Sequence, residues 1–283
     1  MSAHDPLLPH RNAIDEIDAA VLRLLNERAG HARAIGELKG TGVVYRPERE
    51  AEVLRRIQSL NTGPLPGEAV ARLFREIMSE CLAVERPLTI AYLGPAGTFT
   101  QQAAVKHFGH AAHTQACTTI DECFRMVEAR RADYVVAPVE NSTEGSVGRT
   151  LDLLSVSPLQ ACGEVVLRIH HHLLRKDHAQ MAGISKVYAH AQALAQCHDW
   201  LSRHLPDAVC ISVSSNAEAA RLAAQSGEAG VAAIAGQSAA EIYQLVKVAE
   251  NIEDEPNNTT RFLVLGHQDT APTGRDKTSL VIS

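Results

Sequence analysis

The first 86 residues carry the hydrophobic pattern of helices. Along residues 11–39, side chains of one stripe recur at alternating spacings of three and four. That stripe consists of Ile14, Ile17, Val21, Leu24, Arg28, His31, Ile35 and Leu38. Gly40 and Gly42 end this helix, and Pro47 suits the first turn of a second helix over 47–60. A third helix is expected over 68–85, before Pro87.

After Pro87 the chain changes to short apolar runs that alternate with helical stretches, which is typical of βαβ units. Strands are expected at 89–94, 132–140, 184–190, 208–214, 230–235 and 261–266, and helices at 119–131 and 217–225. The run 159–176 is expected to cross between two lobes of this structure. The pattern predicts the fold class α + α/β: an all-helical domain over 1–87 and a two-lobed α/β domain over 88–267.

Composition and charge remove several classes of function. Hydrophobic residues make up 45% and charged residues 21% of the chain, which are ordinary globular values. The net charge is −6, and residues 1–86 hold 12 Lys and Arg against 13 Asp and Glu, so no nucleic-acid partner is expected. No apolar run is long enough for a membrane helix, and no signal peptide is visible at the start. We therefore expect a cytoplasmic protein without a membrane partner.

Metal and disulfide sites are not expected. The six cysteines are scattered without a C-x-x-C motif, which indicates reduced thiols. His170, His171 and His172 are consecutive, so on a strand two of them would share one face and the third would take the other. No carboxylate or Cys partner stands at metal-site spacing. The expected complement is no metal and no cofactor.

Arg28 interrupts the apolar stripe of the first helix, where a guanidinium is costly unless an anion meets it. It could instead reach solvent or pair with a buried Glu. Arg11 and Lys39 flank the same helix, and Arg49 and Glu50 open the next. Arg11 and Arg28 lie 17 positions apart, or roughly 25 Å along a helix, which no small metabolite spans. If both serve one site, they come from two subunits of a homodimer.

These residues resemble the all-helical chorismate mutases. The resemblance rests on Arg11, residues 26–28, 38–39 and 46–50, and the helix 73–85. It implies a helix-swapped dimer that rearranges chorismate to prephenate without a nucleophile or metal. Arg11 of one subunit, with Arg28 and Arg49 of the other, would bind carboxylates. Lys39 would face the ether oxygen, and Glu50 would hold the ring hydroxyl.

Three positions depart from that family pattern. Cys81 stands where relatives often have Ser, and Arg46 stands where some have an acidic residue, so Arg46 is given no role. Glu85 stands where many relatives have Gln. By the resemblance, Glu85 would donate a hydrogen bond to the ether oxygen, which only its protonated form can do. We therefore expect mutase activity to be highest at acidic pH, and Glu85→Gln to retain it at higher pH. The alternative is a solvated charge at the end of the helix.

Uncharged polar residues follow several of the predicted strands. Gly94 and Gly97 allow a tight turn before Thr98, which can cap the next helix. Taken singly, such residues are more often caps than ligands. Together they are typical of a cleft between two α/β lobes. The remaining members of this set are Asn141, Ser142, Gln192, Ser214 and Ser215.

The segment Asn258-Thr259-Thr260-Arg261-Phe262 completes a second resemblance. With GPAGTF, APVENSTEG and AHAQALAQC it resembles the prephenate dehydratases over residues 89–266, whose architecture is similar to periplasmic binding proteins. The resemblance implies that Thr260 protonates the leaving hydroxyl while carbon dioxide departs. Arg261 would bind a carboxylate, and Asn141, Gln192 and Ser215 would line the cleft. A β-branched residue entering a strand is the alternative for Thr260.

The two resemblances together predict an enzyme of phenylalanine biosynthesis with both activities and with chorismate and prephenate as substrates. One alternative is that only one activity is retained, because of Cys81 and Arg46. Another is a non-enzymatic two-lobed sensor with a helical dimerisation head. Residues 268–283 resemble a linker and the opening strand of an ACT regulatory domain, so we expect the chain to stop within that domain.

Overall fold

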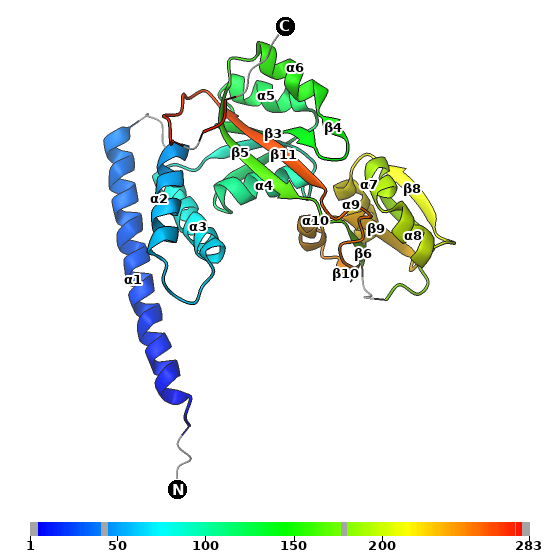
Figure 1. The fold of residues 1–283 in the computed structure, drawn as a ribbon, viewed down its shortest axis with the longest axis horizontal. Helices are drawn as coiled ribbons and strands as arrows, with labels where there is room; N and C mark the ends of the chain where they lie inside the picture. The colour runs from blue at the N-terminus through cyan, green and yellow to red at the C-terminus, as the bar shows by residue number, and fades with distance from the viewer. Residues whose placement is uncertain (1–4, 41–44, 177–179, 275, 279–283) are drawn as a thin grey trace. The chain divides into compact units, whose positions relative to one another are not determined.

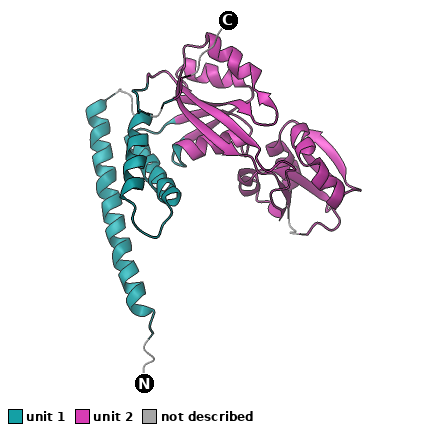
Figure 2. Cartoon of the chain, in the orientation of Figure 1, with its two compact units in different colours: residues 1–88, 108–112, 270–276 teal, residues 89–107, 113–269, 277–283 magenta. Residues whose placement is uncertain are grey.

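The computed structural model describes residues 5–40, 45–176, 180–274 and 276–278. It divides into two compact units (Figure 2). Unit 1 comprises residues 1–88, 108–112 and 270–276, and unit 2 comprises 89–107, 113–269 and 277–283. The predicted strand over the last residues and the predicted stop at Gly42 lie outside the described residues.

Unit 1 is built on three helices, as the pattern predicted: α1 Leu8–Lys39, α2 Pro47–Leu60 and α3 Gly67–Glu85 (Figure 1). Pro47 occupies the first turn of α2, where its missing N–H costs nothing. Gly40 ends α1 with φ +57°, a conformation that favours glycine. All three helices are amphipathic, yet no residue of α1 is buried, although every one of them is described.

Unit 2 contains two sheets, and the predicted two-lobed α/β architecture is confirmed. The first sheet has the order β2-β1-β3-β11-β5, with β4 paired to β3. β2 and β3 run parallel to β1, while β11 runs antiparallel to both β3 and β5. Its strands are β1 Thr89–Leu93, β2 His113–Cys117, β3 Tyr134–Asn141, β4 Gly145–Ser146, β5 Gln160–Arg168 and β11 Thr259–Gly266. Its helices are α4 Phe99–Phe108, α5 Ile120–Glu128 and α6 Gly148–Val156.

The second sheet has the order β10-β6-β9-β7-β8. β7, β8 and β9 are parallel, and β6 and β10 are antiparallel additions. Its strands are β6 His172–Arg175, β7 Lys186–His190, β8 Val209–Val213, β9 Val231–Ala235 and β10 Val246–Ala249. Its helices are α7 Ala191–Gln196, α8 His198–His204, α9 Asn216–Gln225 and α10 Gln237–Ile242.

Two segments carry the chain between the sheets. β5 belongs to the first sheet and β6 to the second, so the predicted crossing within 159–176 is confirmed, at residues 169–171. The return runs from β10 to β11. His170 and His171 therefore lie in a connection and not on a strand, which corrects the premise that the three histidines alternate across one strand. These two connections bring polar residues of both lobes together.

Candidate functional sites

The C-terminal halves of α1 and α3 approach each other closely in unit 1. Lys39 Nζ donates to Glu85 Oε1 at 3.0 Å, and the Glu85 side chain is only 6% exposed. A Cβ at Gly36 would meet Glu85 Cγ at 2.5 Å, so a residue without a side chain is needed there. Cys81 is buried one turn before Glu85 on the same helix. The structure thus brings Lys39 and Glu85 into contact, with Cys81 one turn away on α3.

Glu50, near the start of α2, is close enough to Arg75 and Arg28 for both to act on its carboxyl group. Burial of its carboxyl group raises the pKa of Glu50 to about 7, although Arg75, Arg28 and the Tyr45 hydroxyl each act to lower it. Arg28 therefore has a carboxylate near it, which is the pairing that the sequence had left open. Arg75 and Tyr45 are additions that the sequence did not single out. Arg75 is an ordinary residue on the amphipathic helix α3, and Tyr45 precedes α2 outside any periodic pattern, so neither drew attention in the sequence.

Arg11 and Arg49 lie outside this cluster within one chain. Arg11 is exposed and pairs with Asp5 at 3.0 Å. Arg49 is exposed and pairs with Glu52 at 2.6 Å. Arg11 also remains some 25 Å from Arg28 along α1. A single unit 1 therefore contains the Lys39–Glu85 pair and Glu50 with Arg28 nearby, whereas Arg11 and Arg49 form ion pairs elsewhere.

In unit 2, Thr260 enters β11 opposite Asn141, the last residue of β3. Asn141 Nδ2 donates to Thr260 Oγ1 at 2.8 Å and to Asn258 Oδ1 at 3.0 Å. Asn258 is buried, and its own Nδ2 donates to Gln196 Oε1 at 2.9 Å. Gln196 Nε2 in turn donates to Thr143 Oγ1 at 3.0 Å. Thr260 thus sits at the end of an uncharged network of amides and hydroxyls.

Three other predicted residues of unit 2 form hydrogen bonds between their side chains and the backbone. Thr98 Oγ1 donates to the Leu93 carbonyl at 3.0 Å and accepts from Gln101 N–H, so it caps α4. Ser142 Oγ accepts from Thr259 N–H at 2.9 Å. Ser215 Oγ caps α9 by accepting from Glu218 N–H at 3.0 Å. Ser214 is exposed beside it. The side chains of Thr98, Ser142 and Ser215 thus bond backbone atoms.

Gln192 and Arg261 do not join the Thr260 network. Gln192 is exposed, and Gln196, one helical turn later on α7, takes the place next to Asn258. Arg261 follows Thr260 on a strand, so its side chain leaves the opposite face. There its Nε lies 3.6 Å from Glu140 and its Nη1 lies 3.6 Å from Glu164. The structure gives Arg261 carboxylate neighbours rather than a place beside Thr260.

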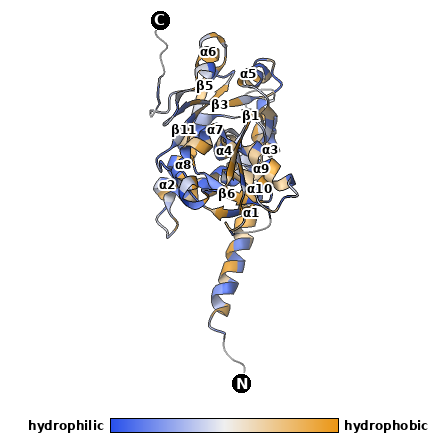
Figure 3. Ribbon diagram, turned by 90° about the vertical axis from the view of Figure 1, so that its right-hand side faces the viewer, coloured by the Kyte–Doolittle hydropathy of each residue, from blue (hydrophilic) through white to orange (hydrophobic). Residues whose placement is uncertain are grey.

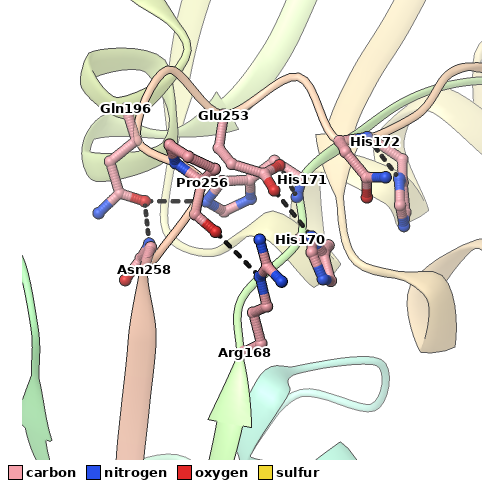
Figure 4. A network of polar contacts seen from close by, with 9 residues as sticks. Arg168, His170, His171, His172, Gln196, Glu253, Pro256 and Asn258 are labelled. Atoms are coloured by element: carbon pink, nitrogen blue, oxygen red, sulfur yellow. Dashed lines mark hydrogen bonds and ion pairs between the residues drawn. The ribbon is translucent and has the colours of Figure 1, made fainter.

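Beyond Gln196 the network continues into the connection between the sheets (Figure 4). His171 Nε2 lies 2.9 Å from Gln196 Oε1, and Glu253 binds both the His171 backbone N–H and His170 Nδ1. Glu253 is thus a carboxylate partner that the sequence spacing did not reveal. Among the residues that the structure describes, no group of three His, Cys, Asp or Glu side chains could hold a metal ion. The described helices also include none long and apolar enough to cross a membrane.

Two family models match the chain in regions that do not overlap. The prephenate dehydratase model matches residues 90–270, and the chorismate mutase type II model matches residues 10–86. The first region contains the Thr260 network, and the second contains the Lys39–Glu85 pair and Glu50. Each polar cluster therefore lies within its own family match.

Individual relatives agree with the family models. The bifunctional chorismate mutase/prephenate dehydratase of Neisseria gonorrhoeae is 76% identical over 277 residues, which are 98% of this chain and 76% of that protein. The protein of the same description from Pseudomonas aeruginosa is 51% identical and is covered over 79% of its length. The prephenate dehydratase of Arthrobacter aurescens, solved with L-Phe, is 32% identical with a TM-score of 0.61, covering 68% of this chain and 63% of that one. The chain therefore belongs to the bifunctional chorismate mutase/prephenate dehydratases, with a type II chorismate mutase region followed by a prephenate dehydratase region.

Proposed function

We propose that this protein rearranges chorismate to prephenate in its helical unit and converts prephenate to phenylpyruvate, water and carbon dioxide in its α/β unit. The observation that carries the second activity is the hydrogen bond from Asn141 to Thr260. Because Thr260 Oγ1 accepts this bond, its own O–H is available to donate. That proton goes to the ring hydroxyl, which leaves as water, and solvent then returns a proton to Thr260 Oγ1. The bond to the ring carboxylate breaks in the same process, and its electron pair completes the aromatic ring.

An uncharged site suits this reaction, because aromatisation supplies the driving force and the enzyme contributes orientation and one proton. Asn141, Gln192 and Ser215 remain proposed substrate contacts. The same proposal includes Thr98, Ser142, Ser214 and Arg261. Gln196 and Asn258 join this proposal because they complete the network around Thr260.

The mutase reaction is pericyclic, so it needs a site that holds a compact conformer and stabilises charge on the ether oxygen. Lys39 and Arg28 supply positive charge, Glu50 accepts from the ring hydroxyl, and Glu85 and Cys81 lie at the ether end. Glu85 accepts from Lys39 in the structure, so Lys39 can exchange this partner for substrate.

The missing cations Arg11 and Arg49 support a homodimer through α1. Ile14, Ile17 and Leu24 are each more than half exposed and recur at helical spacing along α1. Hydrophobic and hydrophilic residues alternate along this helix (Figure 3). A second copy that covers these three residues would bring its own Arg11 toward Arg28. All six cysteines are free thiols, which suits the cytoplasm.

Incubation of the purified protein with chorismate, and separately with prephenate, tests both halves of the proposal. We expect prephenate to accumulate from chorismate, and phenylpyruvate to form from either substrate. If phenylpyruvate forms from prephenate but chorismate is not consumed, only the dehydratase activity is present. If chorismate gives prephenate but no phenylpyruvate forms from either substrate, only the mutase activity is present. Absence of both products would reject the proposed function and favour a sensor.

A further inference from the structure

The hydrogen bonds between Thr260 and His171 have a direction that can be derived atom by atom. Asn141 Oδ1 accepts from the backbone N–H groups of Thr143 and Glu144 at 3.0 and 3.1 Å. Backbone N–H groups can only donate, so this Asn141 atom is the amide oxygen and the other is the nitrogen. Asn141 therefore donates to Thr260 Oγ1 and to Asn258 Oδ1.

The donor and acceptor atoms are fixed in the same way from Asn258 to His171. Asn258 accepts with its oxygen, so its nitrogen donates to Gln196 Oε1. That oxygen also lies 2.9 Å from His171 Nε2, and an amide oxygen cannot donate. Nε2 of His171 therefore carries the hydrogen. Its Nδ1 is buried and has no hydrogen-bond partner in the described part of the chain.

His171 is held firmly in place. The residue is 2% exposed, and Phe99 packs edge-on against its ring at a centroid distance of 5.7 Å. Glu253 Oε2 accepts from its backbone N–H at 2.9 Å. Burial lowers the pKa of His171, in keeping with a neutral ring that has one N–H. The ring therefore presents one donor in a set direction.

The acceptor of that donor joins the two lobes. Gln196 is the last residue of α7, which follows a strand of the second sheet. Its carboxamide contacts Asn258 and Thr143, which adjoin strands of the first sheet. Without a donor at His171, the Gln196 oxygen would lose one of its two partners, and the amide could rotate.

We propose that His171 is a positioning residue for the dehydratase reaction: its Nε2–H holds the Gln196 carboxamide in the orientation that anchors Asn258 beside Asn141 and Thr260. This inference rests on the proposed function, because it assigns the network a role in orienting the Thr260 hydroxyl. The competing explanation is that His171 only fills space between the lobes.

Two substitutions separate these explanations. In His171→Gln the new amide nitrogen can occupy the position of Nε2 and donate to Gln196 Oε1. In His171→Asn the new side chain is too short to reach that oxygen. We expect kcat with prephenate to fall about tenfold in His171→Asn, the equivalent of one hydrogen bond, with KM within about twofold. His171→Gln should stay within about threefold of wild type. His172→Asn is the matched control, because His172 is equally buried but contacts Asn251 N–H and not Gln196.

Turnover of prephenate by the wild type is the reference, so its absence would reject the proposed function rather than this inference. Equal kcat values for His171→Gln and His171→Asn, whether normal or reduced, would overturn the positioning role. A double-mutant cycle covers the case of general destabilisation. In a Gln196→Ala background, His171→Asn should have no further effect on kcat, and an additional tenfold loss would overturn the proposal.

Discussion

The candidate sites of the helical unit and the α/β unit differ in charge. In the helical unit the site is charged, with Lys39 paired to Glu85 and Glu50 lying near two arginines. In the α/β unit the residues around Thr260 are amides and hydroxyls. Charge suits a reaction in which negative charge develops on an ether oxygen, and a neutral network suits the delivery of one proton.

The two units also differ in how much of the site one chain contains. The strands β6 and β9 of unit 2 are buried throughout, and the ends of β3 and β11 carry a network that is connected within one chain. The longest helix of unit 1 buries none of its residues and leaves Arg11 far from Arg28. Unit 2 thus has a polar network that is connected within one chain, whereas for unit 1 we propose a site that a second chain completes.

The largest expected effect separates the two activities at Thr260. Thr260→Ala should lower dehydratase turnover by about 10²–10⁴-fold, the range typical of a lost general acid, and leave mutase turnover unchanged. Steady-state assays with prephenate and with chorismate measure the two. Thr259→Ala is the matched control on the neighbouring position of β11. Near-normal phenylpyruvate formation by Thr260→Ala would remove Thr260 from the mechanism.

The reciprocal change is Arg28→Ala. We expect mutase turnover to fall by about 10²–10³-fold, because one charged donor to the substrate is lost and Glu50 keeps only Arg75. Dehydratase turnover with supplied prephenate should not change. Arg23→Ala removes an exposed arginine of the same helix, paired with Glu27, and should leave both rates unaltered. A parallel loss of both activities would argue against separate sites.

Glu50 is expected to make the free energy of unfolding of the helical unit depend on pH. Its folded pKa of about 7 exceeds the ordinary value of 4.5, so the folded state binds the proton more tightly. Its stabilising contribution to the free energy of unfolding is therefore present at pH 4.5. This contribution, up to about 3 kcal/mol, is lost as the pH rises to 7. Glu50→Gln should unfold at higher urea than wild type at pH 8, with no difference near pH 4.5. Urea titrations of helical signal and mutase activity would check this, and identical pH dependence in both proteins would contradict it.

The smallest expected effect tests whether unit 1 is completed by a second chain. Arg11→Ala and Arg28→Ala proteins should each lack mutase activity. After subunit exchange, half of the dimers are hybrids and one of their two sites carries neither lesion, so about a quarter of wild-type activity should return. Mass spectrometry of differently sized variants would verify exchange. Verified exchange without recovery would mean that Arg11 and Arg28 do not share a site.

Several residues of the candidate sites could be identified only in the folded structure. Alternation along β11 already implied that Arg261 and Thr260 leave opposite faces, although the motif had grouped them. Gln192 and Gln196 lie one turn apart on α7, so periodicity alone could not choose between them. The partners of Thr143, His171 and Glu253 could not be found from the sequence, because these partners are distant in the chain. The edge strands β2 and β10 were also missed, since their exposed residues show no continuous apolar run.

The sequence by itself determined the three helices of unit 1, most central strands of unit 2 and the family of each region. The periodic stripes, Pro47 and the glycines are local signals, and they placed the three helices within a few residues and most central strands. The motif around Thr260 was likewise contiguous. Tertiary structure alone decided which side chains meet: Gln196 rather than Gln192 beside Asn258, and Glu50 beside Arg28 and Arg75. The physical reason is that a hydrogen bond depends on distances of about 3 Å between groups that chain topology brings together, and periodicity carries no information about such distances.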